Sequence, residues 1–349
     1  MPKICVIAGD GIGVDVTAEA MKVLRILNEK HALALDIEEL DYGAERYLRD
    51  GTTLPPGEME RFRNEADAIY LGALGDPRIP DMRHGREILL AMRFELDLYV
   101  NYRPVRCLAD RLCPLRDWKA DDIRFSVFRE NTEGVYVGMG GNFKKGTADE
   151  VAINEDVNTR KGVERIIRAA FEYAQKNNRA RVTMVDKSNA MAYAHGLWRR
   201  VFETVGQEYQ SIEQQHLFVD AAVMHMVRDP RQFDVVVTSN LFGDILTDLG
   251  AELQGGMGMA GSANINPGGV SLFEPVHGSA PPLAGKNKAN PIASMLTLEM
   301  MLEHLGFGEA ALDLGAAVQS AVQSNQLTEE VGGALGTREV GDFIASQLA

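Results

Sequence analysis

The sequence predicts an α/β protein with about two domains. Short apolar runs alternate with longer amphipathic segments, which is the pattern of strands and helices packed in layers. The length of 349 residues exceeds what one hydrophobic core comfortably fills. Polar clusters follow four of the apolar runs. In open α/β sheets, ligands bind beyond the carboxyl ends of the strands, so these clusters indicate a binding site.

The strands are expected in short runs of β-branched and other apolar residues that end in glycine or polar residues. These runs are residues 4–8, 68–71, 123–128, 182–185 and 233–238. Helices are expected where apolar residues recur every three or four positions. These segments are residues 14–28, 85–96, 161–175, 196–205, 292–305 and 309–323.

The composition excludes several classes of protein. A net charge of −14 disfavours nucleic-acid and anionic-membrane surfaces, because neutralising phosphates requires a basic face. No stretch approaches the roughly 20 apolar residues of a membrane span. Three cysteines make neither a disulfide framework nor a metal motif, and the N-terminus leaves no room for a secretory signal. We therefore expect a cytoplasmic protein without membrane or nucleic-acid partners.

The segment Asn-Leu-Phe-Gly-Asp-Ile-Leu-Thr-Asp at residues 240–248 carries the strongest single signal. It follows an apolar run and is expected to pass from loop into helix. On a helix, Asp244 and Asp248 lie one turn apart on the same face and repel each other unless a cation lies between them. Mg²⁺ or Mn²⁺ suits such oxygen ligands. The alternative, common for an arbitrary Asp-x-x-x-Asp, is a solvated acidic helix face.

Arginines beside apolar residues indicate a site for a carboxylate that bears a branched apolar group. Leu89 and Leu90 precede Arg93 by four and three positions in the segment 85–96. The alternative is that the leucines belong to the core and Arg93 to the surface. Arg103 and Arg129 add two guanidinium groups, whose paired N–H donors suit the two oxygens of a carboxylate.

Tyr136 and Lys187 are candidate proton carriers, although each of them read alone is more often structural. A lysine near other cations can serve as a base near neutral pH, and a tyrosine hydroxyl can serve as the acid.

Asp220 is either a third metal carboxylate or a cap for a helix at 221–226. The loop Gly-Asp-Gly-Ile-Gly at 9–13 either approaches a phosphate or makes a tight turn in which Asp10 caps the next helix. It lacks the full G-x-G-x-x-G spacing.

Together these motifs resemble the metal-dependent decarboxylating β-hydroxyacid dehydrogenases, the isocitrate/isopropylmalate dehydrogenase family. The resemblance runs nearly end to end, and it is most specific at residues 240–248 and at Glu-Pro-Val-His-Gly-Ser-Ala-Pro, residues 274–281. It implies a two-domain fold with a non-Rossmann dinucleotide site. Residues 1–98 and 253–349 would form the cofactor-binding domain, and residues 99–252 the dimerisation and metal/substrate domain.

The resemblance also implies the roles of individual residues. It assigns catalysis to Tyr136 and Lys187, and the metal ligands to Asp220, Asp244 and Asp248. Substrate binding falls on Leu89, Leu90, Arg93, Arg103 and Arg129. Cofactor binding falls on Asn189, Glu274, His277, Gly278, Ser279, Ala280 and Asn290. In this family, the residues that correspond to Lys187 and Asp220 reach the active site from the partner subunit. A homodimer with two shared active sites is therefore expected.

The implied reaction is the oxidative decarboxylation of a malate-type 2-hydroxy acid, with NAD as hydride acceptor and Mg²⁺ or Mn²⁺ as metal. Members that use NAD usually carry an acidic residue at the position of Pro282. The Lys-Tyr pair typical of NADP members is also missing, while Lys286 and Lys288 lie close enough in sequence to meet a 2′-phosphate. NAD is expected, and NADP stays open.

The pair Leu89-Leu90 resembles the isopropyl pocket of 3-isopropylmalate dehydrogenases, which serve leucine biosynthesis. Residues 129–134 resemble tartrate/D-malate and isocitrate enzymes more closely, so a tartrate/D-malate dehydrogenase is the alternative. Isocitrate is disfavoured, because its extra carboxylate would face leucines at a cost of several kcal/mol. A non-catalytic paralogue is disfavoured because every matched catalytic position is occupied.

Overall fold

The computed structural model describes residues 1–349, which divide into two compact units. The first unit comprises Met1–Leu98, Arg106–Asp121 and Ala251–Ala349, and the second comprises Tyr99–Val105 and Asp122–Gly250. Residues 106–121 thus belong to the first unit, although the expected boundary at residue 98 assigned them to the second domain. None of the helices has both the length and the apolar character needed to cross a membrane.

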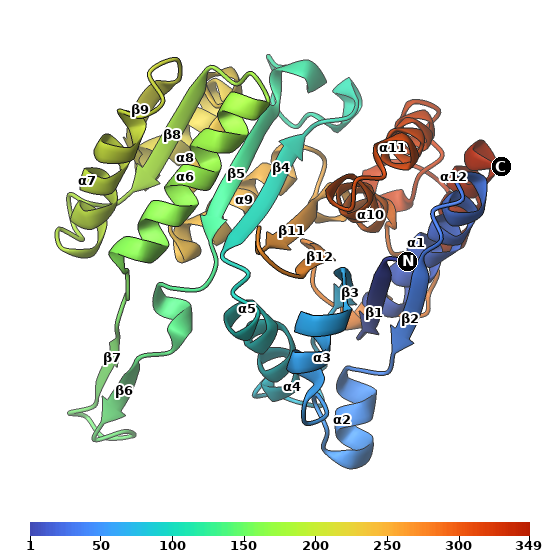
Figure 1. Ribbon diagram of the computed structural model, residues 1–349, viewed down its shortest axis with the longest axis horizontal. Coiled ribbons are helices and arrows are strands. Elements are labelled where there is room, and N and C mark those ends of the chain that lie inside the picture. Colours follow the sequence, from blue (N-terminus) through green and yellow to red (C-terminus); the bar gives the residue numbers. More distant parts are fainter. The chain divides into compact units, whose positions relative to one another are not determined.

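The strands of the first unit follow the order β2 (Asp36–Leu40), β1 (Lys3–Gly9), β3 (Ala68–Ala73), β12 (Ser271–Pro275) and β11 (Gly261–Ile265) (Figure 1). The first four are parallel, and β11 pairs antiparallel with β12. All six residues of β3 are buried. A strand of a parallel sheet that is covered on both faces reads in this way, as a continuous apolar run.

Helices cover both faces of this sheet. On one face, side chains of β1 and β3 join a core cluster with α3 (Glu58–Glu65) and with α5 (Ala91–Glu95). On the other face, α1 (Ile12–Lys30) and α10 (Ile292–His304) pack against β3. There the buried Tyr70 donates a hydrogen bond of 2.8 Å to the carbonyl of Ser294. Three further helices, α2 (Ala44–Asp50), α11 (Gly308–Gln323) and α12 (Thr337–Leu348), complete the unit.

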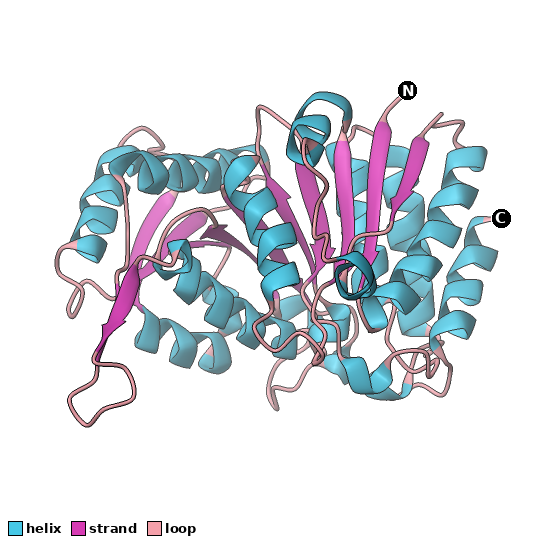
Figure 2. Ribbon diagram, turned by 90° about the horizontal axis from the view of Figure 1, so that it is seen from below, coloured by secondary structure: helices cyan, strands magenta, loops and turns pink.

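The strands of the second unit follow the order β4 (Val100–Arg106), β5 (Arg124–Glu130), β10 (Val235–Thr238), β8 (Arg181–Asp186) and β9 (Glu213–Phe218). The last four are parallel, so their carboxyl ends lie at one edge of the sheet. The helices are α6 (Arg160–Lys176), α7 (Ala194–Gly206), α8 (Val219–Arg228) and α9 (Asn240–Leu253). The antiparallel hairpin of β6 (Gly140–Phe143) and β7 (Val151–Asn154) projects away from them (Figures 1 and 2).

Helix α6 shows how the local sequence sets these elements. The hydroxyl of Thr159 accepts a hydrogen bond of 3.0 Å from the amide of Gly162 and so caps the N-terminus. The helix then buries residues at helical spacing, Val163, Ile166, Ile167, Ala170, Phe171 and Ala174. This amphipathic stripe packs onto β5, β8 and β10.

All five expected strands are present, and five of the six expected helices are continuous α-helices. The segment 85–96 differs, because a π-helical turn, Arg86–Leu90, separates the short α4 (Arg83–Gly85) from α5. Helix α9 begins at Asn240 without the loop expected there. The three cysteines are free, as expected. The strands that were not predicted, β2, β4, β6, β7, β9, β11 and β12, lack a long apolar run or have partners distant in sequence.

Candidate active site

Asp244 is the centre of a charged cluster in the second unit. It lies one helical turn into α9, which follows β10 after a single residue. Its carboxylate accepts hydrogen bonds of 2.5 Å from Nη1 of Arg129 and 2.7 Å from the hydroxyl of Tyr136. Nη2 of Arg103 lies 3.6 Å from the same carboxylate. Four predicted site residues, contributed by β4, β5, the 3-10 helical turn Val135–Val137 and α9, are therefore together.

Asn240, which was not predicted as a site residue, orients Arg129. Its side-chain oxygen accepts bonds of 3.0 and 2.8 Å from Nε and Nη2 of Arg129, and its nitrogen donates to the carbonyl of Glu133. Arg129 is 1% exposed, so its direction is fixed. Gly243 makes room for this arrangement, since a methyl group there would collide with the Arg129 side chain.

Thr247 was also missed, although a signal for it was present. Its hydroxyl accepts a bond of 2.6 Å from Nη1 of Arg103. Residues 240, 244 and 247 recur at the i, i+4, i+7 spacing of one helix face, the same face that was predicted for the aspartates. Applying that spacing to every polar residue of the segment 240–248 would have included both Asn240 and Thr247.

Asp248 shares the α9 face with Asp244, but Asp220 is occupied elsewhere in the same chain. Nζ of Lys187 donates to Oδ1 of Asp220 over 2.5 Å, and this contact lowers the pKa of the carboxyl. Asp220 lies in the first turn of α8, which is capped at Phe218, so the reading of Asp220 as a helix cap is wrong. No group of three acidic, histidine or cysteine side chains in one chain could hold a metal ion.

In the first unit, Arg93 is buried and not on the surface. Its Nη2 donates to Oε1 of Glu274 over 2.8 Å, and the two side chains are 9% and 10% exposed. The amide nitrogen of Asn264 donates to the same oxygen over 2.9 Å. Glu274 therefore holds Arg93, an arrangement that the assignment of Glu274 to cofactor binding did not foresee. Nε of Arg93 is buried without a partner.

The leucines before Arg93 differ in their surroundings. Leu89 packs against the core cluster of the first unit, as in the alternative reading, whereas Leu90 is partly exposed and outside that cluster. The π-helical turn that ends at Leu90 changes the helical register before Arg93. Such turns occur frequently at functional sites.

The glycine loop at 9–13 makes a tight turn, and Asp10 does not cap α1. The N-cap of α1 is Gly11, without a side-chain bond. Asp10 instead accepts bonds from the amides of Ala44 (2.6 Å) and Gly75 (2.7 Å) and lies 2.8 Å from Nε2 of the fully buried His84. Gly11 has a φ of +57°, and a side chain there would collide with the carbonyl of Ser279. The glycines therefore let this loop pack against the loop predicted to bind adenosine.

In that second loop, His277 has an unused acceptor. Burial lowers the pKa of His277, which favours the neutral ring. Nδ1 lies 3.0 Å from the carbonyl of Gly278, so Nδ1 carries the proton and Nε2 has a lone pair. Nε2 is buried and has no partner. Asn290 by contrast accepts from the amide of Ile292 at the start of α10, which is a structural role.

The remaining predicted cofactor residues are mostly accessible. Gly278 and Asn189 are exposed, and Ala280 is half-buried with a φ of +35°. Ser279 is buried, and its carbonyl accepts a bond of 2.8 Å from the amide of Ile12. Pro282 is exposed.

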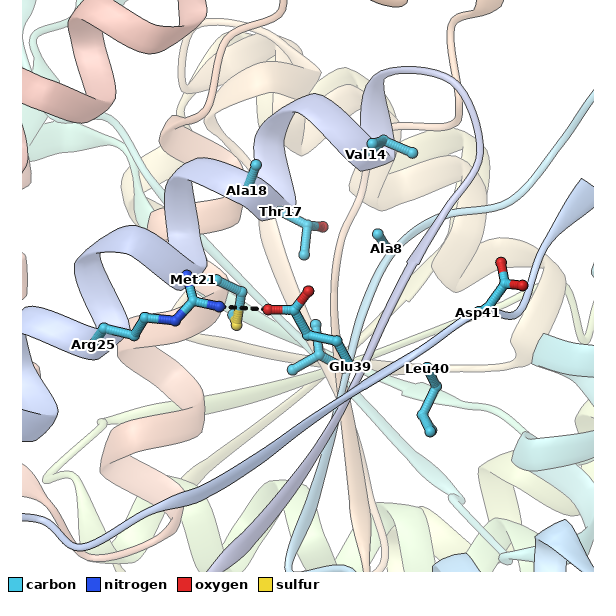
Figure 3. A pocket seen from close by; sticks show the side chains of 10 residues that line it. Ala8, Val14, Thr17, Ala18, Met21, Arg25, Glu39, Leu40 and Asp41 are labelled. Atoms are coloured by element: carbon cyan, nitrogen blue, oxygen red, sulfur yellow. Dashed lines mark hydrogen bonds and ion pairs between the residues drawn. The ribbon is translucent and has the colours of Figure 1, made fainter. Parts of the chain in front are cut away.

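A separate hollow of about 460 Å³ lies between α1 and β2 (Figure 3). None of the predicted site residues lines it. Its walls are largely apolar, and its main polar feature is the exposed ion pair of Arg25 and Glu39. An exposed pair of this kind contributes little binding energy.

Residues 3–344 match the isocitrate/isopropylmalate dehydrogenase family. The chain belongs to this family. The 3-isopropylmalate dehydrogenase of Thermobifida fusca (strain YX) is 48% identical over 349 residues, covering 99% of this chain and 98% of that protein. The enzyme of the same name from Corynebacterium jeikeium (strain K411) is 47% identical over 351 residues, covering 99% of both.

Among solved structures, the dehydrogenase resembles the crystal structure of isocitrate dehydrogenase from Methylococcus capsulatus. The TM-score is 0.90 at 35% identity, and the match covers 100% of this chain and 99% of the other. The predicted α/β fold and the predicted family are therefore confirmed.

Proposed function

We propose that this dehydrogenase oxidises and decarboxylates 3-isopropylmalate, with NAD as hydride acceptor and Mg²⁺ or Mn²⁺ as metal, and serves leucine biosynthesis. The observation that carries the proposal is the Asp244 cluster, a carboxylate with two arginines and a tyrosine, in a chain nearly half identical to enzymes named for this substrate. A tartrate/D-malate activity has no such support among these relatives.

The charges of the cluster suit a divalent cation and a dianionic acid. Arg129 and Arg103 both pair with Asp244. The cluster thus combines a carboxylate, which a divalent cation would bind, with two guanidinium groups, which would pair with the carboxylates of the acid. Asp244 and Asp248 offer the hard oxygen donors that Mg²⁺ and Mn²⁺ take. These residues fit the metal, and a bound cation would supply Lewis-acid stabilisation of negative charge on oxygen.

The protein side chains bind the acid and move its protons. Arg103 and Arg129 hold a carboxylate of the acid, which is a positioning role, and the resemblance assigns substrate binding to Arg93 as well. Nζ of Lys187 accepts the proton of the C2 hydroxyl. The hydroxyl of Tyr136 returns a proton to C3 after CO₂ has left. Its hydrogen bond to Asp244 keeps the Tyr136 hydroxyl pointed into this cluster, ready to act as the acid.

The loop 277–280 fits the adenosine part of a dinucleotide. The lone pair on Nε2 of His277 can accept a hydrogen bond from an amino group, which adenine carries. Bound NAD would supply the acceptor for the hydride of C2. The preference for NAD rests on the resemblance, because the pair of Lys288 with Glu329 at 3.5 Å is exposed and contributes little energy.

The active form is proposed to be a homodimer. The hairpin exposes apolar side chains on both strands, with Phe143 66% and Ile153 52% exposed. An isolated two-stranded hairpin is marginal in water, and exposed apolar patches of this kind mark interfaces. Met224 and Val227 on α8, and Leu241 and Ile245 on α9, form further exposed apolar stripes. A second copy can cover them and supply its own Asp220 and Lys187 to Asp244 and Asp248.

A substrate panel tests the proposed function. NADH or NADPH formation is followed by absorbance with Mg²⁺ and 3-isopropylmalate, D-malate, tartrate or isocitrate, with each of NAD and NADP. The highest kcat/KM is expected for 3-isopropylmalate with NAD. Preference for D-malate or tartrate would replace the proposed substrate, and no turnover in any combination would overturn the function.

A further inference from the structure

We infer that His195, with Asp156 beside its ring, positions the catalytic base, because the His195 imidazole holds the backbone of Lys187. The inference rests on the base role proposed for Lys187. The backbone N–H of Lys187 donates a hydrogen bond of 2.8 Å to Nδ1 of His195, which is 1% exposed at the start of α7.

The tautomer of His195 follows from this bond. Because Nδ1 accepts, the ring proton of the neutral imidazole is on Nε2. Nε2 points to Oδ2 of Asp156 at 3.6 Å. Burial alone would raise the pKa of Asp156, but His195 and Asn158 outweigh it and lower the pKa, so the carboxyl is ionised. At this distance the Asp156 carboxylate attracts the Nε2–H of the imidazole without a hydrogen bond to it, and the hydrogen bond that positions Lys187 is the one to Nδ1.

A chain of hydrogen bonds anchors this arrangement to the core. The side-chain nitrogen of Asn158 donates to Asp156 over 2.8 Å, and Nε1 of Trp198 donates to the oxygen of Asn158 over 2.7 Å. Trp198 is 1% exposed. The His195 ring also contacts the edge of Phe242, with centroids 5.2 Å apart, two residues before Asp244 on α9. The same imidazole thus touches the loop of the base and the helix of the metal aspartates.

The loop before and after Lys187 is fixed independently. Oδ1 of Asp186 accepts bonds from the amide of Ser188 (3.1 Å) and Nε2 of His216 (2.8 Å). The carbonyl of Lys187 accepts from the amides of Ala190 and Met191. Loss of the His195 bond should therefore shift the Lys187 backbone locally and leave the fold intact. A shift of about 1 Å at a catalytic group can cost about a hundredfold in rate.

Three variants separate positioning from mere packing. His195→Asn places an oxygen where Nδ1 lies and keeps the acceptor, His195→Gln places its polar group near Nε2, and His195→Leu removes both. His195→Asn is expected to keep kcat within about threefold, and the other two to lose about tenfold to a hundredfold, with the KM for the hydroxy acid nearly unchanged. Equal kcat values for the Asn and Leu variants would overturn the inference, as would a wild-type kcat in His195→Leu.

Amide hydrogen exchange gives a readout that does not depend on activity. Exchange at Lys187 should be slow in the wild type and in His195→Asn, and faster in His195→Gln and His195→Leu, at equal melting temperatures. Unchanged exchange in His195→Leu would overturn the inference even if the enzyme were inactive. A wild type without turnover on the substrate panel, but with this exchange pattern, would count against the proposed function and not against the hydrogen bond.

Discussion

Removing one partner of the Arg93–Glu274 ion pair should destabilise the first unit strongly. Both side chains are about nine-tenths buried, and their atoms are 2.8 Å apart. Replacing Glu274 by methionine preserves volume but leaves a buried guanidinium uncompensated, which costs about 3–5 kcal/mol. The lost acceptor of Asn264 adds about 1 kcal/mol. At about 2–4 °C per kcal/mol for a unit of this size, the melting temperature should fall by about 8–24 °C.

Calorimetry on Glu274→Met, Arg93→Met and the double variant checks this reasoning. The double variant should melt closer to the wild type than either single variant, because neither charge is left alone. The matched control is Glu203→Met, which breaks the exposed pair with Arg199 and should cost at most about 1 kcal/mol. If Glu274→Met melts within about 2 °C of the wild type, the pair is not a compensated buried pair. The KM for the hydroxy acid should be higher in the double variant than in the wild type, because the double variant also lacks Arg93.

Four further outcomes are expected. Lys187→Met should abolish NADH formation while the melting temperature changes little, and wild-type turnover would remove Lys187 as the base. Asp244→Asn should weaken Mn²⁺ binding about tenfold or more in a calorimetric titration, and an unchanged affinity would exclude it as a ligand. Phe143→Asp in the hairpin should shift sedimentation toward the monomer, which a persistent dimer would contradict. Burial raises the pKa of Glu299 to about 7, so its ionisation destabilises the fold as pH rises from about 4.5 through 7. Glu299→Gln should therefore raise the melting temperature at pH 8 but not at pH 4. An equal shift of the melting temperature at both pH values would refute this.

The sequence predicted those parts of the site whose geometry is local. Asp244 and Asp248 share a face because helical spacing alone places them there. Arg129 was expected near them because parallel strands end at one edge of a sheet. Asn240 and Thr247 were missed only because the helical spacing was applied to the carboxylates and not to the neighbouring polar residues. The roles assigned to these residues stay predictions.

Other features could not be read from the chain. Glu274 lies 181 residues from Arg93, and only the pairing of β12 with β3 and the packing of α5 bring them together. His195 meets the amide of Lys187 because of how the turn before α7 folds back. The π-helical turn before Arg93 also carries no sequence signal that we recognised.

The sequence by itself determined the α/β class, the family and the residues of the charged cluster, since these depend on local periodicity and on motifs of adjacent residues. The tertiary structure alone decided which buried charges compensate one another and which side chain holds the backbone of Lys187. The physical reason is that a buried charge or amide needs a partner within about 3 Å. Which partner comes that close depends on strand order and helix packing, and not on distance along the chain.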